Sequence, residues 1–193
     1  MLERPPQEIQ AAELRRTAHE LGADLVGFTA VDTLERLTPP PLRPSTLAAG
    51  MNAFVVFAKR ILRGVVWSRH LPTKQLAGGR VLRELDRIGG RLCDWLEARG
   101  HIALPVPSGS LDFERRQPEG LTPAGQGSYL LRLAAVEAGL GTWGLNSMVL
   151  TEAFGPRVYL GGVMTRLSLP AKSHTSVAIS PTTTTRRSFS GVK

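Results

Sequence analysis

Three glycines within the segment 134–165 constrain this chain more than any other feature of its sequence. Gly139, Gly141 and Gly144 follow a short amphipathic stretch at 128–138 and precede an apolar stretch that is typical of a strand. Glycine has no Cβ atom, so such a cluster marks a place where the backbone turns tightly or where another group approaches it closely. The chain is therefore expected to pass from a helix through a glycine turn into a sheet, and the turn is the first candidate for a functional site.

The spacing of these glycines also fits the dinucleotide-binding pattern G-x-G-x-x-G. That pattern needs a strand before the glycines, a helix after them and an acidic residue about 20 positions further on. Here the order of helix and strand is reversed, and residues 161–168 hold no acid. Nicotinamide binding is therefore disfavoured. Two interpretations stay open, because the glycines either only permit a sharp turn or also admit a ligand.

Length and composition predict one globular domain with a tail. The 193 residues include 42% hydrophobic residues, which suits a packed core, and no apolar run long enough to predict a transmembrane helix. The N-terminus lacks the apolar part of a secretory signal, so we expect a cytoplasmic protein with no membrane partner. The domain is expected over 1–167. The Ser/Thr/Arg-rich segment 168–193 lacks apolar periodicity and is expected to be a disordered tail.

The charge and the cysteine content limit the kinds of partner and metal site. The net charge is +8, and four of the bases lie in the segment 168–193, which has no acid. This excess leaves nucleic-acid binding open, although a solvated basic surface explains it more simply. Cys93 is the single cysteine, which excludes an internal disulfide and any metal or cluster site built from cysteines alone. No metal site is predicted.

The hydrophobic pattern predicts an α+β fold, with helices packed on a mixed sheet. The expected helices are 7–22, 80–99 and 128–138, and the expected strands are 25–28, 52–59, 102–106, 148–151 and 158–165. The apolar run 52–59 is typical of a strand that is buried on both faces. Prolines place 102–106 at a sheet edge or a strand end. The Pro- and Gly-rich stretches 38–46 and 107–127 are expected to be loops.

The residues around the glycine turn resemble the corrinoid-binding core of the epoxyqueuosine reductase and reductive dehalogenase superfamily. The family pattern runs Ala-Ala-x-x-Ala-Gly-Leu-Gly-x-x-Gly-x-Asn, a short strand, a turn Tyr/Phe-Gly-x-Arg and a strand that ends in Thr. The matching residues here are Ala134, Ala135, Ala138, Gly139, Leu140, Gly141, Gly144, Asn146, Phe154, Gly155, Arg157 and Thr165. Weaker similarity extends over about residues 10–167. The resemblance implies a nitroreductase-like, corrinoid-binding domain.

The resemblance also implies that cobalamin is bound base-off over the glycine turn, mainly by backbone groups. The residues implied to contact it are Ser108, Gly139, Leu140, Gly141, Thr142, Trp143, Gly144, Asn146, Ser147 and Arg157. Asn146 and Ser147 would offer polar contacts, and Trp143 would pack on the ring edge. Arg157 either meets a propionamide or the phosphate, or it only braces a turn. By analogy with a tyrosine of dehalogenase relatives, Tyr129 is a candidate for a catalytic proton donor, with a simple packing role as the alternative.

Two features of the family are missing from this sequence. Family members continue into cysteine repeats that bind two 4Fe-4S clusters, whereas residues 168–193 contain no cysteine. One hypothesis for the Ser/Thr/Arg-rich composition of this segment is a shifted reading frame. The Asp-Tyr-His motif of epoxyqueuosine reductases, in which the Asp is the proposed proton donor, would fall on Arg80, Val81 and Leu82. None of these three side chains can act as a general acid near neutral pH.

The sequence thus predicts the corrinoid-binding domain of an epoxyqueuosine reductase-like, cobalamin-dependent iron–sulfur reductase, a family of tRNA-modifying oxidoreductases. Its expected partner is a corrinoid, and its electrons are expected from a separate donor or from a missing C-terminal region, because the chain offers no cluster ligands of its own. Two alternatives stay open: a non-catalytic module that binds cobalamin or a flavin, and a truncated, inactive remnant. Turnover with added reductant separates an enzyme from a module. A remnant predicts no ligand binding and a melt of low cooperativity.

Overall fold

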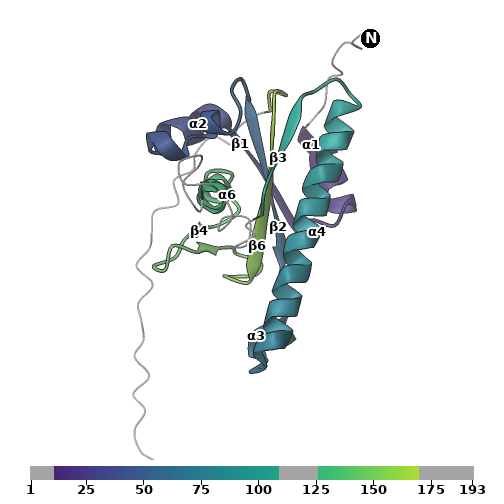
Figure 1. The fold of residues 1–193 in the computed structure, drawn as a ribbon, viewed down its shortest axis with the longest axis vertical. Helices are drawn as coiled ribbons and strands as arrows, with labels where there is room; N and C mark the ends of the chain where they lie inside the picture. Colours follow the sequence, from purple (N-terminus) through teal and green to yellow (C-terminus); the bar gives the residue numbers. More distant parts are fainter. Residues whose placement is uncertain (1–10, 109–125, 170–193) are drawn as a thin grey trace, which may run out of the picture.

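The computed structural model describes residues 11–108 and 126–169, which form three layers with an antiparallel sheet in the middle (Figure 1). In chain order the elements are α1 (Ala11–Glu20), β1 (Leu25–Ala30), α2 (Val31–Leu37), the 3₁₀ turns η1 (Pro40–Leu42) and η2 (Pro44–Thr46), β2 (Ala53–Arg60), α3 (Arg63–Trp67), α4 (Leu71–Glu97), β3 (Ala103–Val106), α6 (Gln126–Glu137), β4 (Thr142–Trp143), β5 (Val149–Leu150) and β6 (Val158–Thr165). No helix in these ranges is both long and apolar enough to cross a membrane.

The main sheet has the strand order β1-β2-β6-β3, and each neighbouring pair is antiparallel. The expected α+β class is confirmed, but the expected mixed sheet is corrected to an antiparallel one in the described ranges. The reason lies in the crossover through α4. It brings β3 back in the same direction as β2, yet β6 lies between these two strands and runs against both, so no parallel pair forms.

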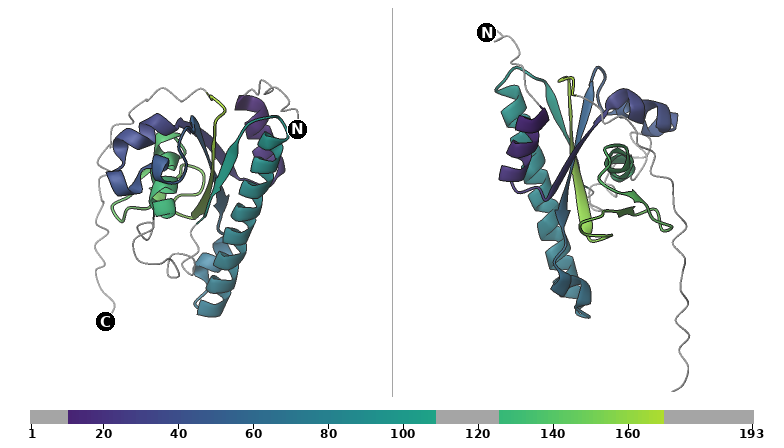
Figure 2. Two further views of the ribbon diagram at one scale, coloured as in Figure 1. Left: turned by 45° about the horizontal axis from the view of Figure 1, so that its top comes forward. Right: turned by 180° about the vertical axis from the view of Figure 1, so that it is seen from behind.

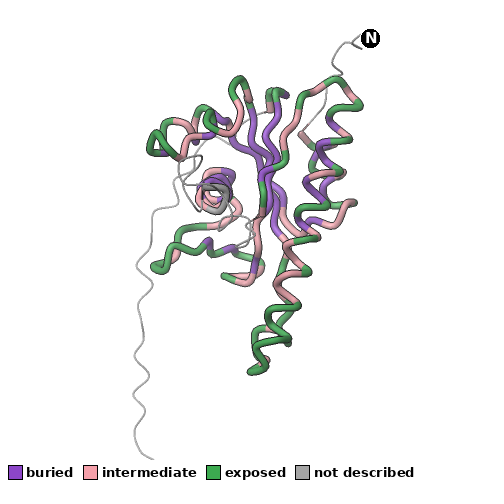
Figure 3. The backbone as a smooth tube through the Cα atoms, in the orientation of Figure 1, coloured by how far each residue is buried: buried purple, intermediate pink, exposed green. Residues whose placement is uncertain are grey.

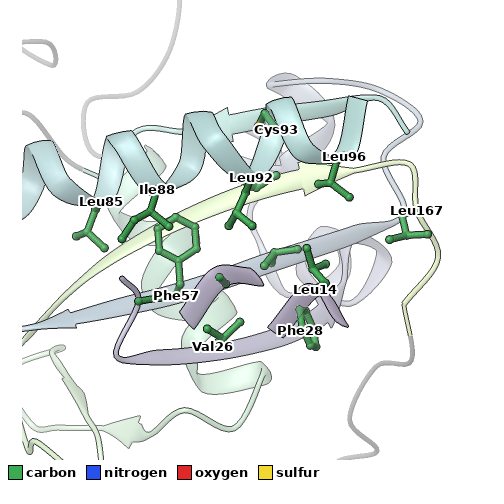
Figure 4. Close-up of a cluster of buried hydrophobic side chains, with 14 residues drawn as sticks. Leu14, Val26, Phe28, Phe57, Leu85, Ile88, Leu92, Cys93, Leu96 and Leu167 are labelled. Carbon is green, nitrogen blue, oxygen red and sulfur yellow. The ribbon is translucent and has the colours of Figure 1, made fainter. Parts of the chain in front are cut away.

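Helices cover both faces of this sheet (Figure 2). On one face α1 and α4 enclose a core around Leu14, Phe57 and Leu92, which Figure 4 shows in close-up. On the other face α2 and α6 enclose a second core around Phe54 and Met164. Successive β2 residues therefore point into different cores, and six of its eight residues are buried. This confirms that the apolar run of β2 is a strand buried on both faces.

Three helices end at a glycine with positive φ, at Gly22, Gly100 and Gly139. In each case the glycine N–H and the next N–H donate back into the last turn of the helix, as from Gly100 to the carbonyl of Glu97 and from His101 to that of Leu96. This pair of hydrogen bonds is the Schellman motif, which needs the left-handed backbone conformation that glycine adopts without strain. Gly22 and Gly100 stand at or directly after the ends of the helices expected at 7–22 and 80–99, as such caps require.

The structure differs from the expected elements in three places. The helix expected at 80–99 begins earlier, at Leu71. Its first residues pack against no core, so the sequence shows no apolar pattern there. The short helices α2 and α3 were not expected, and the loop expected at 38–46 contains the 3₁₀ turns η1 and η2. The tail beyond Leu169, most of the loop expected at 107–127 and the start of the helix expected at 7–22 lie outside the described residues.

Two adjacent glycines in β6 let both helical layers approach the sheet. A Cβ atom on Gly161 would lie 2.5 Å from a ring carbon of Phe57, on the face covered by α4. A Cβ atom on Gly162 would lie 2.6 Å from a ring carbon of Phe54, on the face covered by α6. Both rings are fully buried and cannot move aside freely. The two core aromatic rings of β2 therefore occupy the space that side chains on these glycines would need.

We expect Gly161→Ala to lower the free energy of unfolding by about 1–3 kcal/mol, because the added methyl group overpacks the core. The matched control is Gly90→Ala in the interior of α4, where a Cβ atom meets nothing within 4 Å. There the same change should raise stability by up to about 1 kcal/mol, since alanine favours the helix. Urea denaturation measures both. Equal stabilities of the two variants would contradict this account of β6.

Candidate functional site

The glycine turn leads from α6 directly into the β4–β5 hairpin, which lies on the α6 side of the sheet (Figure 1). Gly139 has φ of 72°, and its N–H donates to the carbonyl of Val136 at 2.9 Å. The N–H of Leu140 donates to the carbonyl of Ala135, also at 2.9 Å. These bonds end α6 in a fixed direction. The chain then enters the hairpin in which Thr142 pairs with Leu150.

Internal packing of the hairpin explains two of the three glycines. A Cβ atom on Gly141 would collide with the backbone carbonyl oxygen of Leu150 on the facing strand. A Cβ atom on Gly144 would lie 3.2 Å from the carbonyl oxygen of Met148, which accepts a hydrogen bond from the Gly144 N–H at 2.8 Å. The glycine spacing is thus required by the close approach of the hairpin's own backbone. The glycines by themselves are no evidence of a ligand.

Two residues predicted to contact a cofactor shape the loop between β4 and β5. The side-chain oxygen of Asn146 accepts a hydrogen bond from the Met148 N–H at 3.2 Å. Ser147 has φ of 59°, a left-handed conformation that is uncommon for a residue with a side chain. Its carbonyl oxygen accepts a hydrogen bond from Arg132 of α6 at 3.0 Å. The side chains of Asn146, within the loop, and of Arg132, on α6, therefore hold the loop in one conformation.

The hairpin exposes an unusual amount of apolar surface. Trp143 is 40% exposed, Leu145 is fully exposed, and Met148 and Leu150 are each exposed to a similar degree as Trp143. Only Val149 points into the core beneath α6. Exposed large apolar side chains on one short element are candidates for a binding surface, and here they occupy both faces of the hairpin, since Trp143 pairs with Val149 and Leu150 pairs with Thr142. We call these four exposed residues (Trp143, Leu145, Met148 and Leu150) the hairpin patch.

Two other residues predicted to contact the cofactor, Ser108 and Arg157, form hydrogen bonds within the protein. The Ser108 hydroxyl donates to the carboxylate of Asp86 at 2.8 Å and lies 3.2 Å from the carbonyl oxygen of Leu82. Both partners belong to α4, on the opposite face of the sheet from α6. Arg157 donates from Nη1 to the carbonyl oxygen of Ile61 at 3.1 Å and so ties the start of β6 to the end of β2. This contact corresponds to the turn-bracing interpretation of Arg157.

Tyr129, the candidate proton donor, lies in the first turns of α6. It is half-buried and packs against the core between α6 and the sheet, which corresponds to the packing interpretation. The structure thus brings together the predicted residues from Gly139 to Ser147 and places Ser108 and Arg157 elsewhere. Sequence reasoning missed Leu145, Met148 and Leu150. Their signal was present, because three large apolar residues beside a glycine turn are more than a short hairpin can bury.

No cluster of metal-ligating side chains lies in the part of the chain that the structure describes. Residues 11–108 and 126–169 contain no group of three or more His, Cys, Asp or Glu side chains placed to hold an ion. Cys93 is buried in the core under α4. Burial raises the pKa of its thiol to about 12, and the nearby carboxylates of Glu97 and Asp94 add to this effect. The thiolate is therefore disfavoured, and Cys93 is a core residue rather than a nucleophile.

Comparison with known proteins supports the resemblance at the level of the fold. No protein-family model and no curated protein sequence matches this chain. Among solved structures, the catabolic reductive dehalogenase NpRdhA matches 82% of the chain with a TM-score of 0.57 and 16% identity. A reductive dehalogenase whose structure suggests a mechanism for B12-dependent dehalogenation matches 86% with a TM-score of 0.54 and 21% identity. An epoxyqueuosine reductase with an epoxyqueuosine-modified tRNA-Tyr stem loop matches 83% with a TM-score of 0.50 and 20% identity.

This chain therefore has the fold that these reductases contain in their matched part. It spans 21% of the length of each dehalogenase and 46% of the length of the epoxyqueuosine reductase. The likeness runs through both described ranges, so it does not depend on the glycine segment alone. The resemblance found around Gly139 and Gly141 is thus confirmed as a likeness of fold.

We expect Gly141→Ala to open the hairpin, because its methyl group meets the Leu150 carbonyl, which cannot move without separating β4 from β5. The free energy of unfolding should fall by about 1–3 kcal/mol. The Gly144 amide, which bonds across the hairpin, should exchange with solvent faster in an NMR experiment. Thr142→Ala, at the exposed neighbouring position, is the control and should leave both quantities unchanged. Unchanged exchange in Gly141→Ala would show that the hairpin does not need this glycine.

Proposed function

We propose that this chain is the corrinoid-binding domain of an epoxyqueuosine reductase-like, cobalamin-dependent reductase. The observation that carries the proposal is the hairpin patch. It coincides with the segment that resembles the corrinoid-binding core, and it lies in a fold shared with B12-dependent and tRNA-modifying reductases. The reductases are much longer than this chain. Electrons would therefore come from a separate donor or from another part of a longer protein.

The residues present fit a large, flat, partly apolar cofactor. The space beside Gly141 is filled by the hairpin itself, so that glycine makes no cradle for a ligand. The exposure of Leu145, and the partial exposure of Trp143 and Leu150, are not explained in this way. Covering apolar surface with a corrin ring stabilises a complex by roughly 25 cal/mol per Å² removed from water. The hairpin patch therefore suits a corrinoid better than the glycines alone suggest.

In this proposal the chain holds and orients the cofactor. Leu145, Met148 and Leu150 would contact the apolar parts of the ring, and Trp143, on the other face of the hairpin, would pack on the ring edge. The side-chain NH₂ of Asn146 has no partner among the described residues and could donate to an amide of the corrin, since its oxygen already holds the turn. When bound, cobalamin would supply a cobalt centre that passes electrons to an electrophilic substrate. Tyr129 stays the proposed proton donor, with a packing role as the alternative.

Ser108 and Arg157 are weaker parts of the proposal, because each already bonds elsewhere in the protein. Either residue would have to exchange its present hydrogen bond for one to the cofactor. The exchange would gain little net free energy, since one hydrogen bond replaces another. Cofactor contacts are therefore assigned first to residues 143–150.

A titration with cob(II)alamin, followed by absorption and electron paramagnetic resonance spectra, tests the proposal. We expect saturable binding with a base-off spectrum. Leu145→Asp should weaken binding by roughly tenfold to a hundredfold, the value of one buried leucine, without changing stability, because this side chain is fully exposed. Leu37→Asp, at a position 49% exposed at the end of α2, is the matched control and should bind normally.

Two results would contradict the proposal. Absence of saturable binding by a protein that melts cooperatively would leave the hairpin as a structural element alone. If Leu145→Asp and Leu37→Asp weakened cob(II)alamin binding equally, the hairpin patch would not be the binding site. If the protein does bind cob(II)alamin, turnover with added reductant distinguishes an enzyme from a non-catalytic module.

A further inference from the structure

A second exposed apolar surface lies away from the hairpin patch, at the end of the molecule where α3 meets the first turns of α4. This part extends beyond the sheet (Figure 1), and Figure 3 shows it as almost wholly exposed. None of the residues of α3 is buried, and the first buried residue of α4 is Leu85. We call the segment 62–76 the basic lobe.

The basic lobe carries five large apolar side chains that are between 43% and 82% exposed. They are Leu62, Val66, Trp67, Leu71 and Leu76. Trp67 is 82% exposed and Leu76 is 72% exposed, so these side chains are almost as accessible as in an unfolded chain. Such a group on one projecting element is more than the scattered single residues that a protein surface normally shows. It indicates a surface that is covered by a partner.

The charges around these side chains have one sign. The lobe contains Arg63, Arg69 and Lys74, and Arg80 and Arg83 continue along the exposed face of α4. Between positions 36 and 83 the sequence has no acidic residue at all. The nearest acid along α4, Glu84, is engaged by Arg87 at 2.6 Å, and the hydrogen bond from Arg87 lowers the pKa of its carboxyl group. The partner is therefore expected to be anionic as well as apolar.

We propose that the basic lobe docks on the surface of an anionic lipid bilayer. Leu62, Trp67 and Leu71 would enter the boundary between headgroups and acyl chains, and the bases would contact lipid phosphates, as in interfacial helices. A projecting, convex tip suits such a deformable plane. Transmembrane length is not needed for this contact. The expectation of no membrane partner rested on the absence of a long apolar run, which a peripheral contact does not require.

The other occupants fit the lobe less well. A nucleic acid would pair with the bases, and Trp67 could stack on a base, but it offers no hydrocarbon for Leu62, Leu71 and Leu76. A second copy of the chain, paired about a twofold axis, would bring the same bases face to face. Like charges at close range oppose such an interface. Charge and apolar character together favour the anionic bilayer.

Co-sedimentation with vesicles tests this proposal on the full chain. We expect binding to vesicles of phosphatidylcholine and phosphatidylglycerol in equal parts, and little binding to phosphatidylcholine alone. Trp67→Ser and Leu76→Ser should each weaken binding about tenfold, because an apolar anchor is lost. Lys74→Glu should weaken it about fivefold or more. All three side chains are exposed, so thermal melts should not change.

Matched controls separate the lobe from the general positive charge of the chain. Leu37→Ser removes an exposed leucine elsewhere, and Arg16→Glu reverses an exposed base elsewhere; both should bind vesicles like the unchanged protein. Normal binding by Trp67→Ser and Lys74→Glu would overturn the proposal, since another basic region would then be responsible. Failure to bind anionic vesicles would also overturn it. If the lobe variants instead abolished binding to an RNA stem loop, the lobe would belong to a nucleic-acid surface.

Discussion

The fold depends on the pairing of β2 with β6 in the middle of the sheet. β2 places apolar side chains on both faces of the sheet. The neighbouring strand β6 has Gly161 and Gly162, which leave space for the ring of Phe57 on one face and that of Phe54 on the other. Because both rings sit beside glycine, helices can pack close on either side. Gly27 does the same for the end of α6, where a Cβ atom would lie 2.8 Å from that of Ala138. The start of the glycine turn is thus fixed by contact with β1.

Much of this could be predicted from the sequence, because burial leaves a pattern. The run of β2, the bounds of β6 and the glycine ends of two helices are visible without the structure. The first turns of α4 and the whole of α3 were missed, since they pack against no core and therefore carry no apolar period. The strand directions were missed for another reason. Local patterns do not say which strands become neighbours, and β6, the last strand in the described ranges, inserts between β2 and β3.

The candidate site shows what a glycine motif can and cannot establish. The sequence located the turn and left open whether it serves a ligand or only the chain. The structure shows that Gly141 serves the chain, because the Leu150 carbonyl lies where its Cβ atom would be. The better sign of a ligand is the apolar surface of Trp143 and Leu145, which depends on how little a short hairpin can bury. The spacing of the glycines does not reveal this property, whereas the three large apolar residues beside the turn, which sequence reasoning missed, indicate it.

The account assigns the main contacts of a corrinoid to the hairpin. Hydrogen–deuterium exchange with and without cob(II)alamin tests it most directly, because exchange reports protection segment by segment. The account predicts that added cob(II)alamin slows exchange in residues 139–150 and leaves the core strands β2 and β6 unchanged. Protection elsewhere, for instance in α3 and the first turns of α4, with none in the hairpin would contradict it.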